Sequence, residues 1–460
     1  MKSFPILNQL GTDFYDVVKP ASFPHPQLRW FNTASAQELG LIPQSPSEIQ
    51  DHFCSFLPFK GNIREPLALR YHGHQFRHYN PDLGDGRGFL LAQFRVHKNI
   101  YDLTTKGSGT TPYSRAGDGR LTLKGAIREI LATEMLESLG VNTSQTLCVF
   151  ETGENLERQD EPSPTRGAVL TRRMHSSIRF GTFQRLAYLN QLEQMQKLVD
   201  YSLQYYFPHL PIRSDQKISQ FFREIVRQTA DMAAQLMTSG FVHAVLNTDN
   251  MNITGEVFDF GPYRFLPSYN PYFTAAYFDH SGLYSYGRQP EALLWGLEQL
   301  GLSLQKIEPH LHIQTFLNDY SQEFYLQHKK HFFRRLNLRP LADAQDDQLI
   351  HLFYTMLSEG PKSFEKTYFD FYGGWARQGW NLKRKDLYQN TTAQDFIQLL
   401  KKYSVSDAPQ LLHPYFLDLD PVTLLIQDIE ELWQPIALND DWSLFKQKLQ
   451  IIQSFRGVYK

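Results

Sequence analysis

Cysteine is scarce in this sequence, which has only Cys54 and Cys148 among its 460 residues. Two thiols cannot build a disulfide framework, and they cannot supply the four ligands of a thiolate zinc site. A chain with so few cysteines is typical of a reducing compartment. The sequence therefore predicts a cytoplasmic protein.

Long apolar runs and an excess of one charge are also missing. No segment approaches the roughly twenty consecutive apolar residues of a membrane-spanning helix. The first residues, MKSFPILNQLGTDFYD, lack both the apolar stretch of a signal peptide and the composition of a transit peptide. The formal net charge is −2, so we expect no nonspecific binding to nucleic acid and none to an anionic membrane.

The rest of the composition is that of an ordinary globular protein. Hydrophobic residues make up 42% of the chain and charged residues 20%, and a chain of this length can bury one large core or about two to three smaller ones. Among the 16 histidines, His72 and His74 flank one glycine. No cysteine or carboxylate cluster lies near them, so a loop or core role is favoured over a zinc site.

Strand signals begin after an irregular start. Residues 1–65 are interrupted by prolines and contain one short helical stretch at 34–40, which indicates a wrapping extension. Residues 89–96 and 100–107 have the pattern of two paired strands, and the turn-rich loop 81–88 precedes the first of them.

The loop PDLGDGRG is a candidate phosphate site. Gly84 and Gly86 would let backbone amides approach a phosphate closely, and Arg87 adds a fixed positive charge. Because a G-x-G pattern alone is more often a plain turn, the interpretation depends on what the rest of the chain supplies.

A lysine and a glutamate further along could support that site. Lys106 closes the second strand, and Glu129 lies on a helix predicted for residues 121–139, which Gly140 ends. A strand lysine paired with a helix glutamate holds nucleotide phosphates in kinases. Glu134 lies closer to the apolar face of the same helix and competes for a buried ion pair. Both glutamates could instead be solvated surface residues.

The middle of the chain predicts structure rather than chemistry. Residues 146–152 and 167–172 have strand patterns and complete a strand-rich unit. Helical periodicity follows over residues 183–207 and 215–237. The chain after residue 293 is mostly helical and rich in aromatic residues. The apolar stripes of these helices predict core positions.

The segment between Gly240 and Gly261 carries the strongest chemical signal. Asn250 ends a polar Asn-Thr-Asp-Asn cluster, and Asp259 opens the tripeptide Asp-Phe-Gly after a short apolar run. A loop asparagine and the aspartate of an Asp-Phe-Gly turn hold Mg²⁺ against nucleotide phosphates in kinases. The spacing therefore predicts a metal-holding loop of the kinase kind.

One kinase residue is missing from this segment. In kinases a catalytic aspartate lies two residues after the loop histidine, but here Val245 stands two residues after His243. Transfer of a γ-phosphoryl group to a hydroxyl then lacks its usual base. Asp249 is the only acidic residue placed to substitute.

Eight motifs occur in this order along the chain: GHQF (73–76), LGDGRG (83–88), KGSGTTPYSRAGDGR (106–120), IRE (127–129), AVLTR (168–172), IRFGTF (178–183), NTDNMNI (247–253) and DFGPY (259–263). On these motifs the chain resembles the selenoprotein O family of pseudokinase-fold protein adenylyltransferases. The similarity spans about residues 20–375, and we expect the C-terminal segment beyond it to diverge from the family.

The resemblance implies a role for each candidate residue. ATP would bind inverted relative to kinases, with its α-phosphorus exposed, so that AMP moves to Ser, Thr or Tyr hydroxyls of proteins, including the enzyme itself. Asp249 would be the proton acceptor, and Asn250 and Asp259 the ligands of Mg²⁺ or Mn²⁺. The implied nucleotide contacts are Gly84, Gly86, Arg87, Lys106, Asp118, Gly119, Glu129 (as the partner of Lys106), Arg172, Arg179 and Asp259.

The expected fold is α+β, a bilobal protein-kinase-like (pseudokinase) fold with a strand-rich small lobe and a helical large lobe. The expected divisions are an N-terminal extension (1–65), an N-lobe (66–173), a helical C-lobe with the metal loop (174–375) and a helical C-terminal extension (376–460). Three alternatives to AMP transfer remain open: UMP transfer from UTP with Mn²⁺, a conventional kinase, and an inactive nucleotide-binding scaffold.

Overall fold

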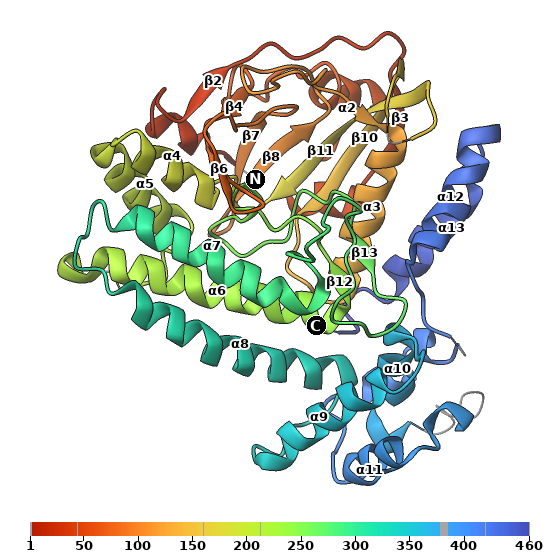
Figure 1. Ribbon diagram of the computed structural model, residues 1–460. Coiled ribbons are helices and arrows are strands. Elements are labelled where there is room, and N and C mark those ends of the chain that lie inside the picture. The colour runs from red at the N-terminus through yellow and green to blue at the C-terminus, as the bar shows by residue number, and fades with distance from the viewer. Residues whose placement is uncertain are drawn as a thin grey trace.

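The computed structural model describes residues 2–43, 45–159, 161–211, 213–377, 385–418 and 420–459. The N-terminal part of the chain forms a large antiparallel sheet, and the C-terminal part is helical (Figure 1). The α+β class expected from the sequence is confirmed. Within the described ranges, no helix is long and apolar enough to cross a membrane.

The sheet contains nine strands, all paired antiparallel. Its main path runs β2-β4-β7-β8-β11-β10-β3, with β1 beside β7 and β9 beside β11. The strands are β1 (Lys2–Ser3), β2 (Tyr15–Val17), β3 (Gln27–Phe31), β4 (Leu67–Leu69), β7 (Leu90–Val96), β8 (Asn99–Lys106), β9 (Leu121–Thr122), β10 (Gln145–Leu156) and β11 (Thr165–Met174).

Residues 1–65 contribute to this sheet from both sides. β2 pairs with β4 through Tyr15 and Leu69, and β3 lies at the far edge against β10 through Phe31 and Cys148. The first segment of the chain thus adds three strands to the sheet, and the division expected at residue 66 stays a prediction.

Apolar clusters cover both faces of the sheet. Helices α1 (Thr33–Glu38) and α2 (Pro46–Phe53) pack on one face over a cluster that includes Phe94 and Phe150. Helix α3 (Leu123–Ser138) belongs to the cluster on the other face. The side chain of Thr122 accepts a hydrogen bond from the amide of Gly125 at the start of α3.

The helical part begins with two short helices where the sequence predicted one continuous stretch over residues 183–207. α4 (Phe180–Tyr188) and α5 (Leu192–Tyr205) are separate because Asn190 has a left-handed backbone with φ = 53°. The other helices are α6 (Lys217–Ser239), α7 (Gln289–Leu304), α8 (Ile313–Leu336), α9 (Ala344–Ser358), α10 (Phe364–Phe371), α11 (Thr391–Leu400), α12 (Ile426–Asn439) and α13 (Ser443–Ser454).

The loop with the strongest chemical signal follows α6. Gly240 ends that helix at φ = 66°, and a Cβ there would lie 2.6 Å from the Phe364 ring. The loop lies between the short strands β12 (Phe241–Val242) and β13 (Arg264–Phe265), and it contains the 3-10 helix η3 (Thr248–Asn250). Two further short strands, β5 (Gly73–Gln75) and β6 (His78–Asn80), pair with each other. β12 pairs with β13, so both ends of the loop are held together.

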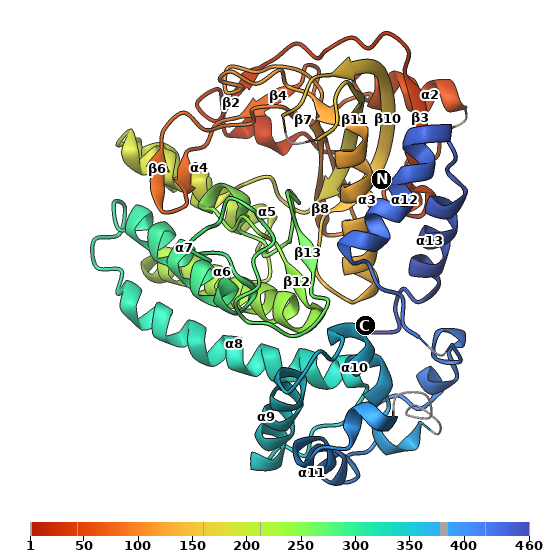
Figure 2. The ribbon, with the colours of Figure 1, turned by 45° about the vertical axis from the view of Figure 1, so that its right-hand side comes forward.

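The last two helices return to the sheet region and lie beside α3 (Figure 2). Ser138 Oγ donates a hydrogen bond of 2.9 Å to the carbonyl of Ile452, and Lys124 Nζ lies 2.7 Å from Glu430. Glu134, also on α3, forms an ion pair of 2.5 Å with Arg456. The C-terminal segment therefore supports the helix that carries Glu129.

Candidate functional site

A cavity of about 760 Å³ lies where the glycine loop, the end of β8 and the loop after α6 meet. Most of the predicted site residues line it, although they come from four separate parts of the chain. Those in its wall are Gly84, Gly86, Arg87, Lys106, Asp118, Gly119, Asp249, Asn250 and Asp259. Glu129, Arg172 and Arg179 are held just behind the wall through the contacts described below.

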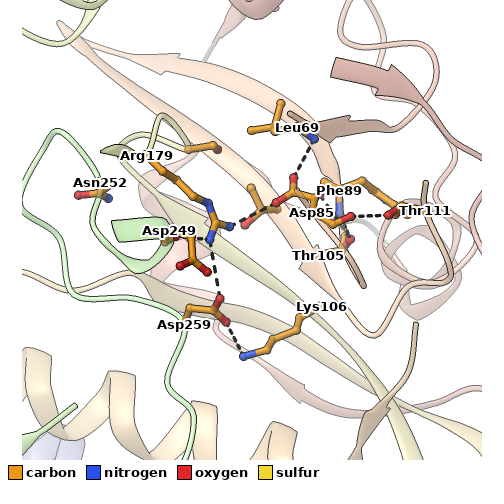
Figure 3. Close-up of polar contacts among 12 residues, drawn as sticks. Leu69, Asp85, Phe89, Thr105, Lys106, Thr111, Arg179, Asp249, Asn252 and Asp259 are labelled. Carbon is orange, nitrogen blue, oxygen red and sulfur yellow. Dashed lines mark hydrogen bonds and ion pairs between the residues drawn. The ribbon is translucent and has the colours of Figure 1, made fainter. Parts of the chain in front are cut away.

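Asp259 is the centre of a charged cluster in this cavity (Figure 3). Its Oδ1 lies 2.6 Å from Lys106 Nζ and 3.6 Å from Arg172 Nη1, and its Oδ2 lies 3.8 Å from Arg179 Nη1. Burial would raise the pKa of Asp259, but the three cations outweigh it and hold the pKa well below its usual range. The carboxylate is therefore ionised throughout the physiological range.

The backbone of Asp259 has φ = 59°, in the left-handed region that few side-chain-bearing residues occupy. Aspartate tolerates this region better than most residues because of its short polar side chain. Such backbone conformations often occur at functional sites. Here the turn directs the carboxylate toward Lys106.

Lys106 also forms the ion pair expected with Glu129. Nζ lies 2.5 Å from Glu129 Oε1, and the two side chains are only 6% and 3% exposed. The pair follows from the fold, because β8 ends at Lys106 and α3 packs across the sheet. Glu134, the competing glutamate, faces Arg456 instead.

The two arginines of the cluster have more donors than the protein satisfies. Arg172 donates from Nε to Thr104 Oγ1 at 3.0 Å, and its buried Nη1 has no hydrogen-bond partner among the described residues. Arg179 donates from Nη1 to the carbonyl of Asp249 at 2.7 Å, and its buried Nε likewise has none. Buried donors left over beside a cavity are suited to an anionic ligand with several oxygen atoms.

Asp85 is a member of this cluster that the sequence analysis missed. Its Oδ1 lies 3.3 Å from Arg179 Nη2, and its Oδ2 accepts a 3.0 Å hydrogen bond from the amide of Leu69 (Figure 3). Burial raises the pKa of Asp85. In the sequence this residue was part of a turn-rich loop, and only its position between two glycines could have suggested a special role.

Asp249 is almost fully buried in the cavity wall, and its Oδ1 has no hydrogen-bond partner among the described residues. Burial raises the pKa of Asp249 to about 6. Its backbone carbonyl is fixed by Arg179. The carboxylate is therefore held in place but keeps one oxygen free for a ligand.

Asn250 and Asp259 satisfy the chemical requirements of a hard divalent cation. Asn250 Nδ2 donates to the carbonyl of Val245 at 2.9 Å, which leaves the amide oxygen available. Asp259 contributes an ionised carboxylate whose side chain is 27% exposed, and Asp249 has its free Oδ1 in the same wall. Oxygen atoms of this kind are the ligands that Mg²⁺ and Mn²⁺ prefer. Among the described residues, no group of three or more His, Cys, Asp or Glu is placed to hold a metal ion, so phosphate oxygens would have to complete the coordination.

The glycines of the cavity are required by close packing. A Cβ on Gly84 would lie 2.3 Å from the ring of Tyr113, and one on Gly119, where φ = 70°, would lie 2.2 Å from the backbone of Gly109. Asp118 forms a 2.9 Å ion pair with Arg158 at the outer edge. The two glycine-rich loops therefore pack directly against each other.

His72 and His74, the two histidines that flank one glycine, lie outside the charged cluster. His72 Nδ1 is 2.7 Å from the hydroxyl of Tyr79, and His74 Nδ1 is 2.8 Å from Gln184 Nε2. Each imidazole thus has a protein partner.

Several cations around one carboxylate, beside a buried second carboxylate and an amide, are typical of proteins that bind a nucleotide polyphosphate. Comparison with known proteins agrees with this class. The family profile described as "Protein adenylyltransferase SelO" matches residues 1–453. The chain belongs to this family.

Two relatives named "Protein nucleotidyltransferase YdiU" are similar over nearly the whole chain, and a third of the same name over 77% of it. The one from Trichormus variabilis is 42% identical, over 98% of this chain and 95% of its own length. The one from Synechocystis sp. is 42% identical, over 98% and 97%. The one from Vibrio cholerae is 35% identical, over 77% and 71%. The expectation that similarity ends near residue 375 is wrong.

Proposed function

We propose that this protein transfers AMP from ATP to Ser, Thr or Tyr hydroxyls of proteins, including itself. Membership of the SelO family supports nucleotide transfer to protein. The position of Asp249 carries the finer assignment, because its free Oδ1 lies in the same cavity wall as Lys106 and Asp259. Val245, at the position of the kinase base, has no group that accepts a proton.

The same reasoning supports a bilobal, protein-kinase-like fold of the pseudokinase kind. A lysine ends a strand of the antiparallel sheet, and a glutamate on the next long helix pairs with it. A helical region follows, with an asparagine and an Asp-Phe-Gly turn in the loop after α6. This serial order is that of the kinase fold.

In the proposed mechanism the cluster around Asp259 binds the triphosphate. Lys106, Arg172 and Arg179 donate to phosphate oxygens, and Glu129 keeps Lys106 in position. Fixed cations need little rearrangement when the reaction occurs, and this preorganisation stabilises developing charge. With ATP inverted, the buried end of its triphosphate lies at Arg172 and Arg179, and its α-phosphate lies near Asp249.

The chemical step exchanges one phosphorus–oxygen bond for another. The hydroxyl oxygen of the protein substrate attacks the α-phosphorus, and the bond from that phosphorus to the oxygen bridging the β-phosphate breaks. Asp249 accepts the proton of the hydroxyl, and pyrophosphate leaves. Asn250 and Asp259 would hold Mg²⁺ or Mn²⁺, which when bound neutralises phosphate charge and stabilises the leaving pyrophosphate.

UMP transfer from UTP with Mn²⁺ is the second candidate. The name of the relatives, protein nucleotidyltransferase, specifies no nucleotide, and the cations of the cluster around Asp259 would bind phosphates rather than a base. A conventional kinase is less well supported because Val245 is apolar, and an inactive scaffold is less well supported because Asp249, Asn250 and Asp259 share one cavity.

Labelled nucleotides distinguish these candidates. The purified full chain is incubated with Mg²⁺ or Mn²⁺ and with ATP labelled at the α- or the γ-phosphate, or with α-labelled UTP. We expect label on protein from α-labelled ATP and none from γ-labelled ATP. Label from γ-labelled ATP alone would contradict the proposal, and preferential labelling by UTP would move it to UMP transfer.

A matched pair of variants tests the proton acceptor. Asp249→Asn should lower the transfer rate by at least about a hundredfold. Asp200→Asn removes a carboxylate that pairs with Lys217 on the surface of α5 and should leave the rate unchanged. Equal rates for the two variants would refute the role of Asp249.

A further inference from the structure

A second cavity, of about 490 Å³, adjoins the first and is lined by more cationic than anionic side chains. It lies between α3, the segment after Asp259 and the C-terminal helix α12, and it shares Arg87, Lys106, Arg120, Arg158 and Gly261 with the nucleotide cavity. Seven cationic side chains line it, against three carboxylates. The cations are Arg87, Lys106, Arg120, Lys124, Arg128, Arg158 and Arg264.

Four of these cations are neutralised by ion pairs within the protein. Lys106 pairs with Glu129 and Asp259, as described above. The remaining pairs are Arg120 with Glu154 at 2.8 Å, Lys124 with Glu430 at 2.7 Å and Arg158 with Asp118 at 2.9 Å.

Another cation, Arg87, is exposed and also lines the nucleotide cavity. Arg128 and Arg264 differ from the paired cations, because among the described residues their side chains donate hydrogen bonds only to carbonyl groups. Arg128 Nη2 donates to the carbonyl of Tyr263 at 2.9 Å, and Arg264 Nη1 donates to the carbonyls of Pro262 and Tyr263 at 3.0 and 2.9 Å. Among the described residues, neither arginine has a carboxylate at ion-pair distance. The guanidinium of Arg128 also lies 4.6 Å from the centre of the Tyr263 ring.

Two like charges side by side in a half-buried wall oppose each other. Burial and the charge of Arg128 both lower the pKa of Arg264. Holding an uncompensated cation away from water costs free energy, and a bound anion would remove that cost. The arrangement is therefore suited to a ligand with negative charges.

The rim of the cavity indicates the size of that ligand. Tyr277 and Phe278 lie at its edge with 77% and 42% of their surface exposed. Exposed aromatic side chains beside arginines are common in surfaces that bind other proteins. A polypeptide can reach a cavity with such a rim, and its hydroxyl side chain would then need to pass only the residues that the two cavities share to enter the nucleotide cavity.

We propose that this second cavity binds an acidic segment of the protein substrate, so that the enzyme modifies hydroxyls near aspartate or glutamate residues. The proposal rests on the proposed function for its chemistry. The nucleotide is the other anion at hand, but Lys106, Arg172 and Arg179 already gather at Asp259 to receive its phosphates. Arg128 and Arg264 are additional to that set.

The first experiment measures binding without catalysis. A fluorescent peptide with one serine and flanking glutamates is titrated with the full chain at low salt, in the absence of nucleotide, beside the same peptide with glutamines. We expect the acidic peptide to bind and the glutamine peptide to bind at least about tenfold more weakly. Added salt should weaken the binding of the acidic peptide. Equal binding of both peptides would overturn the proposal.

Variants locate the binding to the two arginines. The double variant Arg128→Gln with Arg264→Gln should bind the acidic peptide at least about tenfold more weakly. The double variant Arg128→Lys with Arg264→Lys should retain most of the affinity because it keeps both charges. Arg95→Gln is the matched control. Arg95 is on β7, its guanidinium lies over the Phe4 ring, and it is outside the cavity. Unchanged affinity in the glutamine pair would overturn the proposal.

The second experiment measures transfer of α-label from ATP to the same peptides. We expect the acidic peptide to be modified faster, and the glutamine pair of variants to lose that preference with the KM for ATP unchanged. A higher KM for ATP without loss of preference would assign the cavity to the nucleotide and overturn the proposal. Absence of transfer to any peptide and to the enzyme itself would count against the proposed function, while the binding experiment would still decide this inference.

Discussion

Glu129 and Glu134 lie five residues apart on α3, and both are buried, with 2% and 1% of their surface exposed. Both carboxylate oxygens of Glu134 have protein partners. Its two oxygens accept hydrogen bonds from Asn32, Gln453 and Arg456 at 3.0, 2.7 and 2.5 Å. Glu129 faces the opposite way and binds Lys106, which is shared with Asp259 and lines both cavities.

The difference separates a structural ion pair from a functional one. Around Glu134 the carboxylate is satisfied by groups of the protein itself, so the network holds α13 against α3. In the cluster around Asp259, which Glu129 reaches through Lys106, Nη1 of Arg172 and Nε of Arg179 have no hydrogen-bond partner among the described residues. Buried polar groups left unsatisfied are costly. Nε of Arg456 is also unsatisfied, so the distinguishing feature of the cluster around Asp259 is that it borders a cavity that a ligand can enter. Four substitutions test this contrast, in order of decreasing expected effect.

Asp259→Asn should have the largest effect. The change keeps the shape of the side chain but removes the charge around which Lys106, Arg172 and Arg179 gather, and it weakens the proposed metal ligand. We expect the transfer rate to fall by about a thousandfold, which corresponds to about 4 kcal/mol of transition-state stabilisation. Single-turnover transfer of α-labelled ATP at saturating ATP gives the rate. A fall of less than about tenfold would contradict the assignment of Asp259.

Glu129→Gln should lower the transfer rate by about a hundredfold, because Lys106 loses the group that fixes it and a small misplacement of a binding group is enough for such a loss. The midpoint of urea unfolding should shift little, since the substitution is expected to affect the rate rather than the stability. An unchanged rate at saturating ATP would show that Lys106 does not need this partner.

Glu134→Gln is the matched substitution on the same helix, and it should affect stability instead. The new amide presents a donor to groups that are themselves donors, while Arg456 keeps Glu137 at 3.2 Å as a partner. We expect the free energy of unfolding to fall by about 2 kcal/mol, measured by urea denaturation. The transfer rate per folded molecule should stay within about twofold, and a larger loss would show that Glu134 also contributes to transfer.

Ser138→Ala should have the smallest effect. It removes the hydrogen bond from Ser138 Oγ to the carbonyl of Ile452 between α3 and α13 and should lower the free energy of unfolding by about 1 kcal/mol. The same urea titration measures it, and activity should be unchanged. A loss as large as that of Glu134→Gln would mean that the ion pair adds nothing to the attachment of α13.

Local sequence signals predicted the part of the site that depends on chain order. Lys106 ends β8, Gly140 follows the end of α3, and the contact of Lys106 with Glu129 is present. Each of these features has a local cause: a strand pattern, a glycine at the helix end and a glutamate on the helix. The roles given to Asp249 and Asn250 stay predictions, because they concern chemistry with ligands.

Partners that are distant in sequence could not be predicted. Arg456 is 322 residues from Glu134, and no local pattern links the two. Asp85 looked like a turn residue because its contacts with Arg179 and Leu69 arise only when the sheet forms. Similarity in the last part of the chain was missed for a related reason. Helices such as α12 and α13 carry apolar periodicity but no polar motif that a reader of one sequence could match.

The central claim, that the cluster around Asp259 directs attack to the α-phosphorus, is tested most directly by the products of one reaction. The protein is incubated with ATP and Mg²⁺ or Mn²⁺, the released products are separated, and the intact mass of the protein is measured. We expect one pyrophosphate for each hydroxyl modified and a mass increase of one AMP group. ADP in the same ratio, with the mass increase of a phosphoryl group, would contradict it.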